Sequence, residues 1–387
     1  MSRFATSVCV GGTRANVCLI STVSDRFRHD VNLFDPNAEC GATLTAPASW
    51  YTSREFHAVE KDSVFKKNWM HVGNIHECAE PGQYFTGKIA KQPFVVVRGD
   101  DGELRAFYNV CSHHAARVAE GSGTCSEFVC PYHGWTYRHD GKLRKTTNMK
   151  GIKNFRPKFH GLKPIRIDTW GPFVFLNFSE TPEPLHASLS RLDSYIGSVG
   201  GFSGLKFIKR REYNLDCNWK VFVDNYCDGG YHVPYAHEAL AEYIDMGSYE
   251  SFIHPKLSVQ MVSKRDTDDG AGRLGHGACY AFCYPNLMVN RYGPWMDTNT
   301  VVPTGKATCK VTFDYYLQED SGLSDSQVEC ALASSHRVQE EDEYLCHSVQ
   351  SGLESDGYSQ GRYVPRFETP MFAFHRWLYD DFITVIE

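Results

Sequence analysis

The chain has 387 residues, of which 42% are hydrophobic and 22% charged, a composition typical of a soluble globular protein with two domains or one domain carrying a large insert. The formal net charge of −6 and the lack of a basic stripe argue against a nucleic-acid partner, and no apolar run reaches the roughly 18 residues of a membrane-spanning helix. The 14 cysteines are scattered among 17 histidines, so we expect reduced intracellular thiols, some of which bind metal, rather than a disulfide framework.

The first predicted segment is not part of the fold. Residues 1–24 contain two arginines, seven serines or threonines and no acid, which is typical of an organelle transit peptide. An irregular N-terminus is the alternative. We place the transit peptide within residues 1–40 and expect the folded chain to begin after it.

The remaining chain divides into three predicted parts. Residues 41–69 include an amphipathic helix over 53–69 that belongs to the catalytic region. Residues 70–180 read as short strands separated by turns, which predicts a small β domain. In residues 181–387, the alternating runs 280–284 and 311–317 predict an antiparallel sheet, and the segment after Ser324 predicts a long helix that ends near Gly352. The predicted fold class is α+β.

Two pairs of cysteine and histidine indicate a metal site in the β domain. Cys111 precedes His113 by two positions, and Cys130 precedes His133 by three, with sixteen residues between the pairs. Such a set could bind zinc structurally or hold iron. The equal split of thiols and imidazoles, with glycines at the turns, favours a 2Fe–2S cluster in which the thiolates hold one iron and the imidazoles hold the other.

A second pair of histidines indicates another metal site. His232 and His237 would point about 140° apart on an uninterrupted helix. Gly229, Gly230 and Pro234 permit a break that would bring the two imidazoles together. Two ordinary histidines beside a helix end are the alternative.

The segments around these pairs carry a family resemblance. "CPYHGWTYRHDGKL", "NWKVFVDNYCDGGYHVPYAHEAL" and "RVQEEDEYLC" resemble the Rieske-type non-haem iron oxygenases. The resemblance implies an all-β Rieske domain and a catalytic domain with a helix-grip-like antiparallel sheet. It also implies a 2Fe–2S cluster on Cys111, His113, Cys130 and His133. His114 stands where the family usually has an arginine, which leaves the choice between His113 and His114 less secure.

The same resemblance implies the ligands of a mononuclear Fe(II). They would be His232, His237 and Asp342, with Glu341 as the second candidate for the carboxylate. The family usually has an acid three residues before the first of these histidines, where it bridges the two metal centres across a subunit boundary. Gly229 stands there, so we expect Asp228 to take this catalytic role, with Asp224 as the fallback.

From about Trp50 to the C-terminus, the chain resembles the plant choline monooxygenases, a branch of that family, notably in "LMVNRYGPWMDTNTVVPTGKATCKVTFDYYL". This resemblance implies hydroxylation of choline to betaine aldehyde hydrate with O2 and reduced ferredoxin, the first step of glycine betaine synthesis. It also implies a homotrimer with one cluster and one iron per subunit, in the chloroplast stroma. The mitochondrial matrix and the cytoplasm are the alternative locations.

The substrate site is predicted from chemistry and from that resemblance. A quaternary ammonium has no N–H to donate, so aromatic faces or a nearby anion must bind it. We expect Tyr292 and Trp295 to bind substrate, because Gly293 and Pro294 place them around a turn. The alternatives are a Rieske oxygenase or N-demethylase of glycine betaine, carnitine or stachydrine, and a pure Rieske electron-transfer protein without the second metal site.

Overall fold

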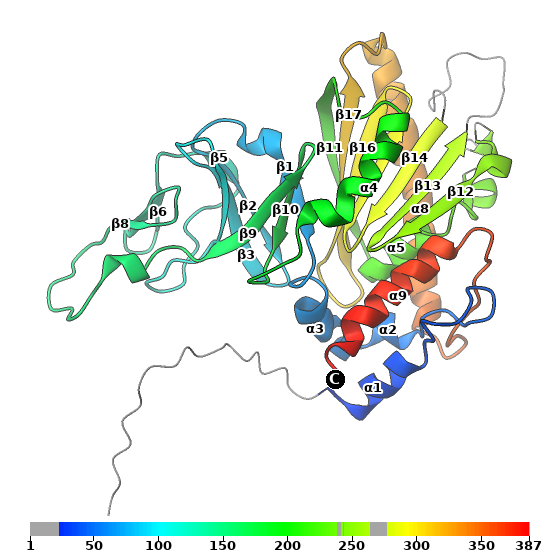
Figure 1. The fold of residues 1–387 in the computed structure, drawn as a ribbon, viewed down its shortest axis with the longest axis horizontal. Coiled ribbons are helices and arrows are strands. Elements are labelled where there is room, and N and C mark those ends of the chain that lie inside the picture. Colours follow the sequence, from blue (N-terminus) through cyan, green and yellow to red (C-terminus); the bar gives the residue numbers. More distant parts are fainter. Residues whose placement is uncertain (1–22, 238–240, 243, 264–276, 387) are drawn as a thin grey trace, which may run out of the picture.

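The computed structural model describes residues 23–237, 241–242, 244–263 and 277–386. A small β part lies at one end of the molecule, and a larger part with a sheet and helices lies at the other (Figure 1). No helix in the described ranges combines the length and apolar character needed to cross a membrane. The predicted transit peptide falls mostly on residues 1–22, which lie outside the described residues.

The folded chain begins earlier than the predicted boundary at residue 40. Helix α1 (Asp25–Asn32) carries Phe27 and Val31, and with Phe34 they form a buried i, i+4, i+7 stripe. The Phe27 ring lies 4.4 Å from that of Phe56 in α3. The segment from Val23 to Phe34 therefore packs its apolar side chains into the core, because a short helix gains most of its stability from packing its apolar face.

Two further helices complete the N-terminal part, α2 (Ser49–Thr52) and α3 (Arg54–Ser63). The helix predicted over 53–69 is thus shorter than expected. The Ser53 hydroxyl caps its start by accepting from the Glu55 N–H, and Asn68 donates its side-chain amide to the Val64 carbonyl just beyond its end. Val64 and Phe65 remain buried after the helix ends.

The β part contains two antiparallel sheets. One has seven strands in the order β1-β10-β9-β4-β3-β2-β5, and the other has three in the order β6-β7-β8. In chain order the strands are β1 (Met70–Asn74), β2 (Gln83–Ile89), β3 (Gln92–Arg98), β4 (Leu104–Tyr108), β5 (Ser122–Thr124), β6 (Phe128–Val129), β7 (Thr136–Tyr137), β8 (Leu143–Lys145), β9 (Pro164–Trp170) and β10 (Phe173–Asn177). The 3-10 helices η1 (Ile75–Cys78) and η2 (Pro157–Phe159) lie in its loops.

The larger part is built on a second seven-stranded antiparallel sheet with the order β11-β17-β16-β15-β14-β13-β12. Its strands are β11 (Leu205–Leu215), β12 (Glu250–His254), β13 (Leu257–Ser263), β14 (Gly277–Cys283), β15 (Leu287–Tyr292), β16 (Trp295–Pro303) and β17 (Cys309–Gln318). Its helices are α4 (Leu185–Ser198), α5 (Trp219–Tyr226), α6 (Val233–Ala236), α8 (Asp325–Leu353) and α9 (Thr369–Ile383), with the 3-10 helix η3 (Met246–Ser248).

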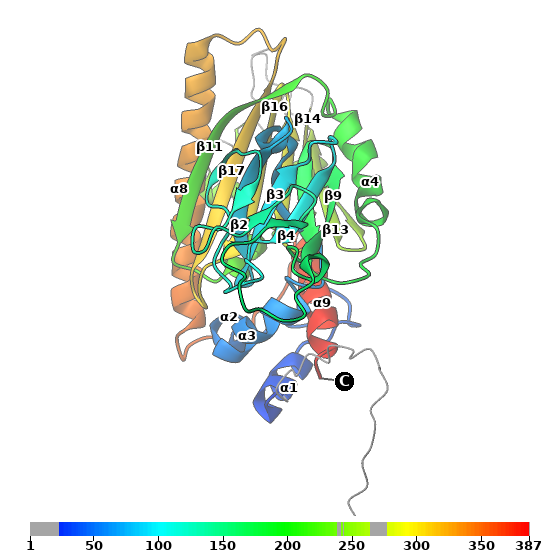
Figure 2. The ribbon, with the colours of Figure 1, turned by 90° about the vertical axis from the view of Figure 1, so that its left-hand side faces the viewer.

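The two faces of this sheet are covered by different helices. Helix α4 lies on one face, and α8 lies on the other (Figure 2). Tyr280, Phe282, Phe313 and Tyr315 belong to the core that includes residues of α5, α8 and α9, whereas Ala281 and Val289 pack with α4. The predicted alternation is therefore confirmed, and so is the α+β fold class.

Helix α8 also agrees with its prediction. The Ser324 hydroxyl accepts from the Gln327 N–H, and the Gln327 side chain returns to the Ser324 N–H, forming a capping box. The helix runs for 29 residues to Leu353.

Charged contacts join the β part to the large sheet. Arg210 on β11 bonds both Glu77 on η1, at 3.1 Å, and Asp314 on β17, at 2.6 Å. Asn74 also donates to Asp314, at 2.8 Å. Asp314 is buried, so this junction fixes the β part against the sheet.

Candidate metal centres and substrate cavity

The Cys111 and Cys130 loops have the same backbone design. In each, the cysteine N–H donates to the carbonyl five residues later, to Ala116 at 2.7 Å and to Trp135 at 2.8 Å. Each loop turns through a positive φ, at Ala115 (62°) and at Gly134 (71°). The matched loops leave β4 and β6 and place one cysteine and one histidine each at the same end of the β part.

The thiols and imidazoles of these loops lie at different depths. Cys111 and Cys130 are buried, His113 is half-buried and His133 is exposed. The rings of His113 and His133 lie 4.7 Å apart, and His113 stacks on Trp135 at 4.6 Å. The buried Nδ1 of His113 has no hydrogen-bond partner among the described residues, as expected of an atom that binds a metal.

Sequence reasoning missed a hydrogen bond to one of the thiols. The Tyr137 hydroxyl on β7 lies 3.1 Å from Cys111 Sγ and 3.1 Å from Ser112 Oγ. Burial, together with the bond to Cys111, raises the pKa of Tyr137 to about 12, so the hydroxyl stays protonated and can donate to a thiolate. Hydrogen bonds to cluster sulfurs tune the reduction potential.

The second histidine pair forms by the predicted break. Helix α5 ends at Tyr226, and Gly229 and Gly230 follow with φ of +71° and +73°. A Cβ on Gly229 would lie 2.0 Å from the Phe367 carbonyl oxygen, so only glycine fits. Pro234 then lies in the first turn of the short helix α6, which begins immediately after His232 and ends immediately before His237.

Helix α8 brings a carboxylate to these imidazoles. The Nε2 atoms of His232 and His237 lie 3.1 Å apart, and Asp342 Oδ1 lies 3.1 Å from that of His237 and 3.5 Å from that of His232. All three ligand atoms lie within 4.8 Å of one another. Two imidazoles and one carboxylate are the donor set of a ferrous site with open coordination positions, so the residues fit a mononuclear iron.

The outward nitrogens of both imidazoles bond carboxylates. His232 Nδ1 lies 2.5 Å from Asp228 Oδ2, and His237 Nδ1 lies 2.7 Å from Glu341 Oε2. Asn225 donates to Asp342 Oδ1 at 3.1 Å. Such outer partners orient a metal-binding imidazole and leave its Nε2 lone pair free for the metal. Glu341 thus bonds the outward nitrogen of His237. It does not lie at the metal-binding position for which it was the second candidate.

The two candidates for the bridging acid differ in their contacts. Asp228 is buried and also accepts the backbone N–H groups of Gly230 and His232. Asp224 accepts from the Tyr51 hydroxyl at 2.6 Å and lies 2.9 Å from His375 Nε2. The geometry therefore favours Asp228 over Asp224 as the acid beside His232.

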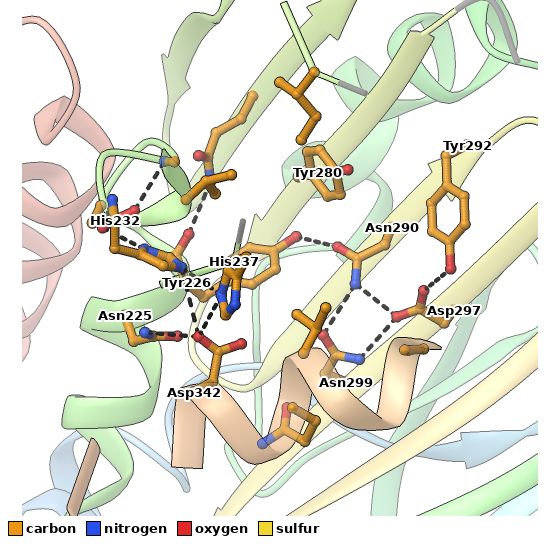
Figure 3. Close-up of a pocket in the computed structure, with 18 of the residues that line it drawn as sticks. Asn225, Tyr226, His232, His237, Tyr280, Asn290, Tyr292, Asp297, Asn299 and Asp342 are labelled. Atoms are coloured by element: carbon orange, nitrogen blue, oxygen red, sulfur yellow. Dashed lines mark hydrogen bonds and ion pairs between the residues drawn. The ribbon is translucent and has the colours of Figure 1, made fainter. Parts of the chain in front are cut away.

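A cavity of about 150 Å³ adjoins the triad. It is far smaller than the ~300–1,000 Å³ of sites for drug-sized ligands, so it suits a substrate of few atoms. Its wall includes the triad and six aromatic side chains, Phe222, Tyr226, Tyr249, Tyr280, Tyr292 and Phe313 (Figure 3). Gln339 of α8 also lines it, and its Nε2 is buried without a hydrogen-bond partner in the described part of the chain.

The predicted substrate residues differ in position. Tyr292 lies in the cavity wall, but Trp295 is not among the described residues that line it. Trp295 pairs with Tyr292 and Leu317 at the first position of β16 and is buried in the core there. Along β16, the lining of the cavity in the described part of the chain begins two residues further, at Asp297, so the substrate-binding role of Trp295 stays a prediction without support from this cavity.

Asp297 is one of the residues of this wall that sequence reasoning missed. Its Oδ1 accepts from Asn290 at 2.7 Å and from Asn299 at 3.0 Å, and its Oδ2 accepts from the Tyr292 hydroxyl at 2.7 Å (Figure 3). The alternation of Trp295, Asp297 and Asn299 along β16 was the available signal, because it places all three on one face.

Comparisons with known proteins agree with this geometry. Residues 68–156 match the Rieske [2Fe-2S] domain model, and residues 202–382 match the catalytic domain of the ring hydroxylating alpha subunit. The chain is 48% identical over 364 residues to the chloroplastic choline monooxygenase of Arabidopsis thaliana, covering 89% of this chain and 84% of the relative. The chain belongs to the choline monooxygenase family.

More distant relatives share the fold of the choline monooxygenase family. The carnitine monooxygenase oxygenase subunit of Escherichia coli (strain K12) is 30% identical, covering 82% of this chain and 87% of the relative. A quaternary ammonium Rieske monooxygenase solved with L-carnitine superposes with a TM-score of 0.78 at 28% identity, covering 89% of this chain and 97% of that one. A naphthalene 1,2-dioxygenase from Rhodococcus sp. at 18% identity, with 93% and 99% covered, has a TM-score of 0.78 and shows the fold alone.

Membership in the choline monooxygenase family implies a Rieske cluster and a mononuclear iron, and this chain has residues that fit both groups. The two buried thiols suit the cluster, and so does His113 Nδ1, which has no hydrogen-bond partner among the described residues. The ring of His114, the alternative to His113 as a ligand, is exposed and lies 5.5 Å from the ring of His133. All twelve cysteines in the described ranges are free thiols.

Proposed function

We propose that this protein hydroxylates choline to the hydrate of betaine aldehyde, using O2 and electrons from reduced ferredoxin. The observation that carries the proposal is the small cavity, which has the two imidazoles and Asp342 at one end and an aromatic wall at the other. Choline is short and has an alcohol at one end and a cation at the other, so it matches a cavity with these two ends.

The proposed ligand roles follow from the contacts. Cys111, Cys130, His113 and His133 would hold the 2Fe–2S cluster, and His232, His237 and Asp342 would hold Fe(II), with one of each group per subunit. When bound, these groups supply single electrons and activate O2. Asp228 and Glu341 hold the imidazoles in place through Nδ1, and the aromatic walls exclude water from the carbon that reacts.

We also propose a homotrimer in which the cluster of one subunit serves the iron of the next. The cysteine loops follow β4 and β6 in the β part, whereas the residues of the triad come from α8 and from the two ends of α6 in the larger part (Figure 1). Electrons tunnel poorly over long distances, so an arrangement across a subunit boundary would shorten their path. Asp228, which is buried and contacts His232, is the residue we place at that boundary.

Ferredoxin is the proposed electron donor, and a basic surface near the cluster supports this choice. Lys142, Arg144, Lys145 and Lys150 are exposed on and around β8, which pairs with the strand that follows the Cys130 loop. An acidic protein would be steered to such a surface, so the rate of cluster reduction should fall as ionic strength rises. Because the similar choline monooxygenase of Arabidopsis thaliana is chloroplastic, we place the protein in the plastid stroma.

The test is turnover under defined conditions. Reconstituted protein, reduced ferredoxin and O2 are supplied with choline, glycine betaine, carnitine or stachydrine, and the products are identified by mass. We expect betaine aldehyde hydrate from choline as the main product. Demethylated product from one of the other compounds, with none from choline, would instead support the alternative of another quaternary ammonium oxygenase. Among these compounds, carnitine is the specific alternative to choline, because the chain superposes on a quaternary ammonium monooxygenase solved with L-carnitine.

A further inference from the structure

Helix α8 lines the cavity with one face. Its lining residues are spaced i, i+3, i+4 and i+7, and they are Ser335, Val338, Gln339 and Asp342. Asp342 contacts both imidazoles of the triad, and the Ser335 hydroxyl lies 3.1 Å from that of Tyr315. Gln339 stands three residues before Asp342, about 4.5 Å from it along the helix axis. Gln339 therefore lines the part of the cavity beside the triad.

The side-chain amide of Gln339 is buried without a partner. Its Nε2 has no hydrogen-bond partner in the described part of the chain. Four other amides of the wall each donate a hydrogen bond within the protein, namely Asn225, Gln260, Asn290 and Asn299. A buried donor without a partner costs free energy, because it gives up its bonds to water and gains none in return. A molecule in the cavity would supply the acceptor that Gln339 lacks.

The hydroxyl group of a small alcohol suits this donor. A hydroxyl oxygen accepts hydrogen bonds, whereas a quaternary ammonium group has no acceptor. The alcohol oxygen is therefore the one atom of choline that can accept from Gln339. When that oxygen is held one helical turn from Asp342, the carbon that carries it lies beside the triad and the N-methyl groups point away from the triad. A fixed orientation of this kind is what attack at one particular carbon requires.

We propose that Gln339 donates a hydrogen bond to the hydroxyl oxygen of the substrate and so determines which carbon is hydroxylated. The inference rests on the proposed function in taking the substrate to be a quaternary ammonium compound with a hydroxyl group. Without this bond, choline can turn and offer an N-methyl group instead. Hydroxylation there uses the same O2, two electrons and two protons and also releases one water. The N-hydroxymethyl product then breaks down to formaldehyde and dimethylaminoethanol.

The first measurement is equilibrium binding to the anaerobic metal-loaded protein, by calorimetry, so that no turnover is needed. Choline is compared with ethyltrimethylammonium, which lacks only the hydroxyl oxygen. We expect the unmodified protein to bind choline roughly 10-fold more tightly, the value of one hydrogen bond. Gln339→Met keeps the length of the side chain without its amide and should lose this preference. Gln339→Leu serves as a second variant if Gln339→Met fails to fold.

Two further measurements distinguish substrate binding from a structural role of Gln339. In turnover with choline, Gln339→Met should raise the ratio of dimethylaminoethanol to betaine aldehyde hydrate roughly 10-fold, because the bond that favours one orientation is lost. The substrate-free variant should unfold at the same or a higher temperature than the unmodified protein, because the change removes a buried donor without a partner. A glutamine that supports the fold would give a lower unfolding temperature.

A matched control is available on the same helix. Gln350 of α8 is also buried, but it does not line the cavity as described. Both ends of its amide are bonded, since Oε1 accepts from the Asn218 N–H at 2.9 Å and Nε2 donates to Glu354 at 3.1 Å. Gln350→Met should therefore unfold at a lower temperature and keep the full preference for choline.

The outcomes separate this inference from the proposed function. Equal binding of choline and ethyltrimethylammonium by the unmodified protein, or an unchanged preference in Gln339→Met, would overturn the role of Gln339 even if choline is oxidised. If choline is not a substrate, the same comparison is made between carnitine and its deoxy analogue. A preference for carnitine that disappears in Gln339→Met would support the role of Gln339 while the choline assignment falls, and a preference that persists would overturn that role.

Discussion

A substitution at Glu341 tests the iron site, because the Glu341 carboxylate bonds one of the three iron ligands, His237. Its Oε2 lies 2.7 Å from His237 Nδ1, and Glu341→Ala removes that bond while leaving all three ligands in place. Loss of an outer partner of a metal ligand typically costs ~10–100-fold in metal affinity. The Glu341 side chain is 38% exposed, so solvent screens the contact and the lower end applies. We expect iron to bind about 10-fold more weakly, equivalent to about 1.4 kcal/mol.

The assay is anaerobic competition for ferrous iron between the protein and a chelator, with the visible spectrum of the cluster as an internal control. Glu340→Ala is the matched variant, because Glu340 is the preceding residue on α8, has a 62% exposed side chain and pairs only weakly with His336, at 3.6 Å. Iron affinity in Glu340→Ala should equal that of the unmodified protein. If Glu341→Ala holds iron as tightly as Glu340→Ala, the bond to His237 does not support the site and our reasoning is refuted.

Four other changes test the remaining assignments. Cys130→Ser should abolish the visible absorption and the electron-spin signal of the cluster, because a thiolate ligand is lost, and an unchanged spectrum would remove Cys130 from the ligand set. Asp342→Ala should stop product formation while the cluster spectrum persists; full activity would make the assignment of the carboxylate wrong. Asp228→Asn can still accept from His232, so both metals should stay bound while single-turnover reoxidation of the cluster by O2 and choline slows; normal reoxidation would exclude the bridging role. Gln339→Leu should weaken choline binding, measured by calorimetry, about 2–10-fold, which is the value of one hydrogen bond, and should leave the iron content unchanged. Unchanged choline affinity would show that Gln339 does not bind the substrate.

Features that depend on neighbouring residues in the chain could be predicted well from the sequence. The cap at Ser324 and the apolar period of α8 are local, and the long helix formed as expected. The break after α5 was also predictable, because Gly229 and Gly230 adopt positive φ and Pro234 restarts the helix. The donor types in both metal sites follow from motif spacing and from family resemblance.

The N-terminal boundary was harder to predict for a physical reason. Compositional bias distinguishes residues 1–24 from the rest, but it does not say where packing begins. Phe27 packs against Phe56 of α3 and Phe382 of α9, and Phe34 packs against Trp50 of α2 and Phe372 of α9, so the burial of this segment depends on residues that are distant in the chain. A stripe of three apolar residues in a polar helix gives a weak signal without those partners.

By itself, the sequence determined the chemical identity of the sites, namely two thiols with two imidazoles, then two imidazoles with a nearby acid, because ligand chemistry depends on residue type and local spacing. Only the tertiary structure decided that Glu341 contacts His237, and that Asp297 rather than Trp295 lies in the cavity wall. Those contacts depend on strand register and on where α8 lies over the sheet. Strand register and the position of α8 are both set by long-range packing, which joins residues up to about a hundred positions apart, as in the bond between His237 and Glu341. No local sequence pattern encodes such packing.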